Sequence, residues 1–146
     1  MSQGSTPVTL EELVCQLIRL FEGLRLKAYW DANGKVWTIG YGHTKDVTPR
    51  MEITREQAES LLLEDSDPLF RIVGTQRPIL EAAALIDFGF NCGERALRRL
   101  LAGEITFQSY GRTSGGQLLA GLETRRDFEE ILIRLSKQLA PPVEKT

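Results

Sequence analysis

Apolar positions near the start of the chain follow the 3.6-residue period of an amphipathic helix. The residues on this face are Leu10, Leu13, Val14, Leu17 and Phe21. The "TLEE" segment before them is typical of a capping box, in which Thr9 caps the helix and Glu12 reaches back to it. The pattern therefore predicts a helix over residues 10–22, ended by Gly23, with Glu22 at its carboxyl end.

The pattern changes after this helix to the alternation of a strand. The segments "LRLKAYW" and "KVWTIGY" alternate, and the turn-prone "DANG" lies between them, which predicts a β-hairpin. Gly40 and Gly42 weaken the second strand and indicate either a bend or a third short strand beyond it. We expect this β-hairpin lobe to span about residues 24–50.

Helical patterns fill the rest of the chain. A second capping box, Thr54 with Gln57, opens a helix that Pro68 either ends, kinks or restarts. The nearly all-apolar "ILEAAALIDFGFNCG" predicts a buried central helix, and "ERALRRLLAG" a shorter one ending at Gly103. A loop-rich segment precedes a last amphipathic helix, "LETRRDFEEILIRLSKQL".

These elements together predict an α+β protein. A chain of 146 residues fits a single domain, 1–146, in which the hairpin lobe is joined to a helical lobe. The helical lobe takes in about residues 54–140 together with the N-terminal helix 10–22.

Composition narrows the class of protein. A hydrophobic content of 42% and a charged content of 26% are those of an ordinary globular protein. The net charge of −2 argues against general nucleic-acid binding. No stretch is apolar enough to predict a membrane span, and the first residues lack the basic region of a signal peptide. We therefore expect a protein kept in the cytoplasm until something releases it.

Cysteine and histidine usage makes a metal centre improbable. Cys15 and Cys92 belong to no CxxC pattern, and His43 is the only histidine in the chain. Two buried reduced thiols are the favoured interpretation, and the spacing leaves a disulfide open. We expect no metal and no cofactor.

Polar chemistry is concentrated between residues 21 and 44. A carboxyl at a helix C-terminus meets the negative end of the helix dipole, so Glu22, beside Phe21 and Leu24, is placed to keep a proton as a general acid does. The alternative is a solvated glutamate at a helix end. Asp31 is either a second functional carboxylate or only a turn-former, and Thr38 is either functional or only a strand-former.

Two such carboxyl groups fit the hydrolysis of a glycosidic bond. One carboxylic acid protonates the leaving oxygen, while a second carboxylate activates water or attacks the sugar. Sequence spacing does not fix the distance between Glu22 and Asp31, so it leaves retention and inversion open.

The string E-G-L-R-L-x-A-Y-x-D…G…W-T-I-G-Y-G-H-T closely resembles the phage-type lysozymes, the muramidase endolysins of tailed phages. The later segments "ITREQAESLLLED", "ALIDFGFNCG", "LLAG" and "GGQLLAGLETRRDFE" resemble that family in the same order. The resemblance covers roughly residues 10–135. It implies a lysozyme-like fold and hydrolysis of the β-1,4 bond between N-acetylmuramic acid and N-acetylglucosamine in peptidoglycan, which lyses bacteria.

The resemblance also implies roles for particular residues. Glu22 matches the general acid of the family, Asp31 its second carboxylate, and Thr38 the threonine that helps to hold the attacking water. The family inverts the anomeric centre. His43 matches a structural histidine that pairs with an acid on the following helix, here Asp65.

Three further positions match residues near the sugar. Asn91 matches a polar position that lines the sugar cleft, with a helix-end cap as the alternative. Arg125 and Arg126 match a basic pair that faces either the cleft or the solvent. The implied partner is the peptidoglycan glycan strand, with no nucleic acid and no membrane insertion, and we expect a monomer.

The chain departs from the family in two places. The turn between Asp31 and Thr38 is one residue longer than usual, and the segment 92–116 is several residues shorter than its counterpart. The shortening predicts a helix beside the substrate groove that has lost about a turn, with weaker sugar binding. Two other functions stay open: a lysozyme-like module that binds glycan without cutting it, and a lytic transglycosylase, which Asp31 disfavours because that reaction needs no water-activating carboxylate.

Overall fold

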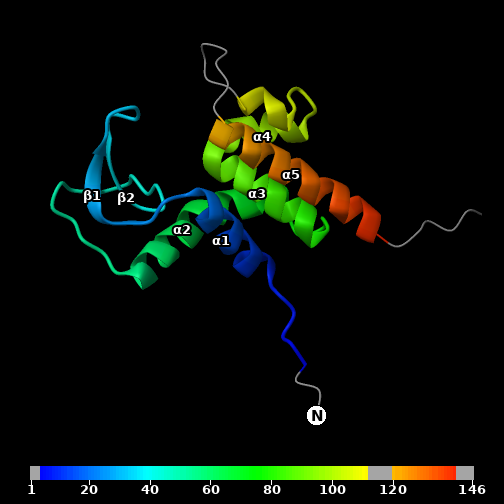
Figure 1. The fold of residues 1–146 in the computed structure, drawn as a ribbon, viewed down its shortest axis with the longest axis horizontal. Coiled ribbons are helices and arrows are strands. Elements are labelled where there is room, and N and C mark those ends of the chain that lie inside the picture. Colours follow the sequence, from blue (N-terminus) through cyan, green and yellow to red (C-terminus); the bar gives the residue numbers. More distant parts are fainter. Residues whose placement is uncertain (1–3, 112–119, 141–146) are drawn as a thin grey trace, which may run out of the picture. The chain divides into compact units, whose positions relative to one another are not determined.

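The computed structural model describes residues 4–111 and 120–140. The chain divides into two compact units, residues 1–67 and 68–146. Figure 1 shows their helices and strands. The first unit holds a helix, a β-hairpin and most of a second helix, and the second holds helices, so the α+β prediction is confirmed.

The first unit opens with helix α1, Leu10–Phe21. Its capping box is present as predicted: the backbone N–H of Glu12 donates to Thr9 Oγ1 at 3.2 Å, and the N–H of Thr9 donates to Glu12 Oε2 at 2.9 Å. The helix ends one residue earlier than predicted, because Glu22 is extended, with φ −97° and ψ 133°. Gly23 has no left-handed backbone, so it is not the residue that ends the helix.

The predicted hairpin follows. Strand β1, Arg25–Asp31, pairs antiparallel with β2, Val36–Gly40. Beyond β2 the sequence predicts a bend or a third short strand, and the structure has the bend together with part of such a strand. The chain bends at Gly40, with φ 66°, so that Ile39 and His43 form a bridge. Residues 51–53 then lie along β1, where the N–H of Ala28 donates to the Met51 carbonyl at 2.9 Å, but they form only an isolated bridge.

Helix α2, Arg55–Val73, begins at the second predicted capping box and runs through Pro68. The prediction that Pro68 ends the helix or starts a new one is therefore wrong. Proline removes one backbone donor from a helix interior. Here Leu62 and Leu69, on either side of it, are both buried. Burial of the flanking leucines offsets the missing hydrogen bond.

The second unit contains helices α3, Ile79–Cys92, α4, Glu94–Leu101, and α5, Ala120–Leu139. A short 3₁₀ helix, η1, covers Phe107–Tyr110. As predicted, α3 is the buried central helix, and residues 82–89 are all buried. The loop predicted before α5, including part of the shortened segment, falls on residues 112–119 and lies outside the described residues.

Gly89 lets the helices of this unit approach closely. A Cβ atom at this position would lie 2.9 Å from Leu69 Cδ2 and 2.9 Å from Leu97 Cδ2. Phe88, beside it, contacts the rings of Phe107 and Tyr110 edge to face, with centroids 5.4 and 5.7 Å apart. These contacts hold α3 as the core of the unit. Within 4–111 and 120–140, no helix has the length and apolarity needed to cross a membrane.

Candidate active site

Glu22 lies at the junction of α1 and the hairpin, as the C-cap of α1. Its backbone N–H donates to the Ile18 carbonyl at 2.8 Å, which completes the last turn of the helix. The residue is half-buried and has at least one further polar or electrostatic interaction. Because β1 begins at Arg25, Glu22 is held between two regular elements of one unit.

Asp31 is the last residue of β1, and its carboxylate folds back over the turn. Oδ1 accepts a hydrogen bond from the backbone N–H of Asn33 at 3.0 Å, the geometry of an Asx turn. A Cβ atom at Gly34 would lie 2.9 Å from the other oxygen, Oδ2. The structure therefore shows the turn-forming contact of Asp31, and this contact also fixes where the carboxylate points.

Asp31 and Thr38 lie on the same face of the hairpin. Asp31 is opposite Val36, and Thr38 is two residues further along β2. Residues directly opposite one another share a face, as do residues two apart on one strand. Trp30 and Trp37 occupy the other face and pack edge to face, with ring centroids 5.7 Å apart.

The environment of Thr38 differs from that of Asp31. Thr38 is only 3% exposed, and its Oγ1 lies 3.4 Å from the Val36 carbonyl, to which it donates a long hydrogen bond. Asp31 is half-buried. A hydroxyl held so loosely can turn to another acceptor or donor.

The structure brings His43 and Asp65 together. His43 Nδ1 lies 2.9 and 3.0 Å from the two carboxylate oxygens of Asp65, and Nε2 lies 2.9 Å from the Lys45 carbonyl. Each ring nitrogen therefore faces an oxygen that accepts hydrogen bonds, from the Asp65 carboxylate on one side and the Lys45 carbonyl on the other. The pair joins the chain after β2 to α2 within the first unit.

Asn91 lies on α3 in the second unit and is half-buried. Its Oδ1 is 3.6 Å from the Cys92 sulfur. It does not cap the helix: Gly93, with φ 95°, is the C-cap, and its N–H donates to the Gly89 carbonyl at 2.8 Å. The alternative role of Asn91 as a helix-end cap is therefore wrong.

Arg125 and Arg126 are buried, 3% and 0% exposed, so of the two alternatives the one in which they face the solvent is wrong. Arg125 forms a two-pronged contact with Asp87 on α3, Nε to Oδ2 at 2.9 Å and Nη2 to Oδ1 at 2.7 Å. A guanidinium in such a fork matches the carboxylate geometry and holds it firmly. Direct contact with a sugar would require Arg125 to leave this position.

Arg126 lies deeper in the same cluster. It donates to Glu129 Oε1 at 2.8 Å and to the Cys92 sulfur at 2.6 Å, and its guanidinium carbon is 4.9 Å from the Phe88 ring centroid. Burial, helped by a hydrogen bond with Asp87, raises the pKa of Glu129 to about 10. Burial likewise raises the pKa of Cys92 to about 11, which makes it a poor nucleophile.

Sequence reasoning missed Asp87, Glu129 and Gly34. A signal for Asp87 was present, because one acid within "ALIDFGF" must find a partner if the helix is buried. Cys15 and Cys92 are both free and half-buried. Among the described residues, no group of three or more His, Cys, Asp or Glu side chains is arranged to hold a metal ion.

The helix-capped glutamate and the acid-bearing hairpin, joined to a helical unit with a buried central helix, define a lysozyme-like protein. The chain belongs to the phage lysozyme family, whose sequence pattern matches residues 19–129. It is 35% identical over 136 residues to an endolysin of Bacillus phage PZA, covering 80% of this chain and 51% of that protein. This chain thus spans about half the length of that relative.

Other relatives match over more of their length. An endolysin of Acyrthosiphon pisum secondary endosymbiont phage 1 is 35% identical over 134 residues, 80% of this chain and 91% of the relative. Among solved structures, the muramidase domain of SpmX from Asticaccaulis excentricus is similar, with a TM-score of 0.73 and 31% identity over 92% of this chain and all of that one.

Proposed function

We propose that this protein is a peptidoglycan hydrolase, a muramidase that cleaves the β-1,4 bond between N-acetylmuramic acid and N-acetylglucosamine. The observation that carries the proposal is the shared face of Asp31 and Thr38 on a hairpin that follows Glu22 directly. Membership of the phage lysozyme family supports the same activity.

In the proposed reaction Glu22 acts as the general acid. It gives its proton to the oxygen that leaves as the glycosidic bond breaks, so the departing sugar is released as a neutral hydroxyl. Asp31 accepts a proton from a water molecule, and Thr38 Oγ1 holds that water by a hydrogen bond. The water attacks the anomeric carbon on the face opposite Glu22, which inverts its configuration.

Asn91 is proposed to contact the sugar chain from α3. It is half-buried, and its side-chain oxygen accepts only a long hydrogen bond of 3.6 Å from the Cys92 sulfur within the described ranges. For Arg125 and Arg126 we propose support in place of sugar contact. The Arg125–Asp87 pair joins α5 to the helix that carries Asn91. Arg126 pairs with Glu129 on α5 itself and donates to Cys92 on that same helix.

Rate measurements on three variants test the assignment. Glu22→Gln and Asp31→Asn remove one acidic group each at nearly constant size, while Glu11→Gln, an exposed change in the first turn of α1, is the control. We expect wall solubilisation to fall by about 10²- to 10⁴-fold in the first two and not in the control. Equal rates in all three would overturn the roles of Glu22 and Asp31.

The stereochemistry of the product tests the inverting route. Proton NMR of a soluble glycan oligomer during the first turnovers should show the α anomer at the newly freed end. A β anomer would require two successive displacements at the anomeric carbon, and the proposed role of Asp31 would then be wrong. A protein that binds the walls but releases no sugar ends would be a glycan-binding module.

The place of action follows from the same proposal. The protein accumulates in the host cytoplasm as a monomer and reaches the wall when the membrane is opened. Fractionation of expressing cells before and after addition of a pore-forming agent tests this, since lysis should begin only after the pore is made. Lysis without a pore would point to another export route.

A further inference from the structure

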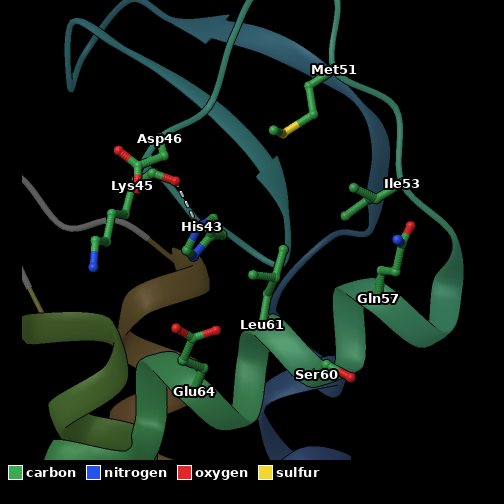
Figure 2. A pocket seen from close by; sticks show the side chains of 9 residues that line it. All are labelled: His43, Lys45, Asp46, Met51, Ile53, Gln57, Ser60, Leu61 and Glu64. Carbon is green, nitrogen blue, oxygen red and sulfur yellow. Dashed lines mark hydrogen bonds between the residues drawn. The ribbon is translucent and has the colours of Figure 1, made fainter.

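A pocket of about 420 Å³ opens in the first unit, on the hairpin side of α2 (Figure 2). Half-buried apolar side chains form its floor, namely Met51, Ile53 and Leu61. Figure 2 shows Met51 and Ile53 reaching in from the chain after the hairpin and Leu61 from α2. The volume lies in the range of pockets that hold small ligands.

Backbone hydrogen bonds join the walls of this pocket to the hairpin that carries Asp31 and Thr38. Ile39 and His43 exchange two backbone hydrogen bonds of 2.9 Å, next to Thr38 on β2. On the other edge, the N–H of Ile53 donates to the Leu26 carbonyl on β1 at 2.9 Å. A ligand in the pocket would therefore be held at a fixed place relative to Asp31 and Thr38.

The rim carries three charged side chains, Lys45, Asp46 and Glu64. Lys45 and Glu64 are exposed, and neither forms an ion pair with another residue of the described ranges. Figure 2 shows their charged ends on the same side of the pocket. Four other charged side chains of the unit are paired, Arg19 with Glu59 at 2.6 Å and Lys27 with Glu52 at 3.0 Å.

We propose that this pocket binds the stem peptide of the wall, the short peptide attached to the muramic acid. The proposal rests on the function proposed above. Small methyl-bearing side chains, such as those of alanine residues, contact the apolar floor. Glu64 pairs with a peptide ammonium group, and Lys45 with a peptide carboxylate.

The lining favours a peptide over a sugar. Binding sites for sugar rings commonly offer an aromatic face, and the nine residues that line this pocket include no Phe, Tyr or Trp. A zwitterionic peptide, with its ammonium and carboxylate groups, instead matches two acids and one lysine around an apolar floor. An extended chain advances about 3.3–3.6 Å per residue, so a four-residue stem peptide can reach roughly 13 Å from the sugar that carries it.

The test compares two substrates and two charge variants. Lys45→Gln and Glu64→Gln each remove one rim charge, and Glu56→Gln removes an exposed charge of α2 that does not line the pocket. Each protein digests intact walls and walls from which an amidase has removed the peptides. On intact walls we expect the half-saturating wall concentration to rise about three-fold in each rim variant and about ten-fold in the double variant.

The maximal rate, digestion of the stripped walls and the Glu56→Gln control should all stay unchanged. Equal effects on intact and stripped walls would overturn the proposal. Isolated stem peptide, titrated against the parent protein by NMR, should move the backbone resonances around Met51 and Leu61. The absence of such shifts would overturn the peptide site even if the protein hydrolyses walls, and a parent that hydrolyses neither wall would overturn the proposed function instead.

Discussion

Gly34 lies directly beneath the carboxylate of Asp31. A Cβ atom at Gly34 would come within 2.9 Å of Asp31 Oδ2 and within 3.3 Å of Val36 Cγ1. The absence of a side chain at this position in the turn thus leaves room for the carboxylate in the orientation that the Asn33 N–H fixes.

Gly34→Ala should lower activity more than stability. The tightest contact is with the end of a side chain, which can rotate away, so we expect a loss of at most about 1 kcal/mol in the free energy of unfolding. The displaced carboxylate should reduce the maximal rate of wall digestion about ten-fold or more, since small misplacements of reacting groups are costly. Urea unfolding and wall turbidity give the two values. An unchanged rate would mean that the orientation of Asp31 does not matter.

The His43–Asp65 pair should contribute to stability and not to the reaction step. Its side chains are 10% and 32% exposed, so Asp65→Asn should cost about 2 kcal/mol of unfolding free energy, less than for a fully buried pair. Asp46→Asn, an exposed change nearby, is the control, because asparagine tolerates the left-handed backbone there. Equal unfolding free energies for parent and Asp65→Asn would refute the structural role.

The Asp87–Arg125 pair should matter more for folding, because both side chains are almost fully buried. Asp87→Asn leaves a buried guanidinium without its negative partner, and we expect a loss of about 3–5 kcal/mol. The measurement is thermal or urea unfolding of the variant. Were Arg125 instead to serve mainly as a sugar contact, Asp87→Asn would weaken wall binding while leaving unfolding unchanged.

Glu129 should make stability depend on pH. Its pKa is about 10 when folded against 4.5 ordinarily, so the folded protein binds the extra proton more tightly than the unfolded chain. The stabilisation that this raised pKa gives the folded protein is complete below about pH 4.5 and is lost as the pH rises towards 10. The unfolding free energy should therefore fall with pH by at most about 1.4 kcal/mol per pH unit.

Glu129→Gln imitates the neutral acid and should remove this slope. Comparing the unfolding free energies of the variant and the parent at pH 6 and pH 8 isolates the effect from other titrating groups. The unfolding free energy of the variant, relative to that of the parent, should be higher at pH 8 than at pH 6. A difference that stays constant would show that Glu129 is ionised in the folded protein.

Local signals let the sequence predict much of the first unit. Thr9 with Glu12 and Thr54 with Gln57 act over three residues, so each capping box is visible in the sequence and occurs in the structure. Pro68 misled because burial on both sides outweighs one missing hydrogen bond. The expectation that proline ends a helix rests on local sequence alone and takes no account of that burial.

The arginine cluster depended on tertiary contacts that no local pattern shows. Arg125 and Asp87 are 38 residues apart in sequence, and only the packing of α5 on α3 joins them. Likewise, the distance between Asp31 and Thr38 along the chain says nothing of a common face. That follows from the register Asp31 to Val36, which the turn sets.

The central claim is that Glu22 and Asp31 direct water to a glycosidic bond, and the most direct measurement is wall digestion in heavy-oxygen water followed by mass spectrometry of the released sugars. Each newly formed reducing end should carry one heavy oxygen, and Glu22→Gln and Asp31→Asn should release almost none. Sugars that end in an anhydro ring without heavy oxygen, or labelled ends released at full rate by both variants, would contradict the claim.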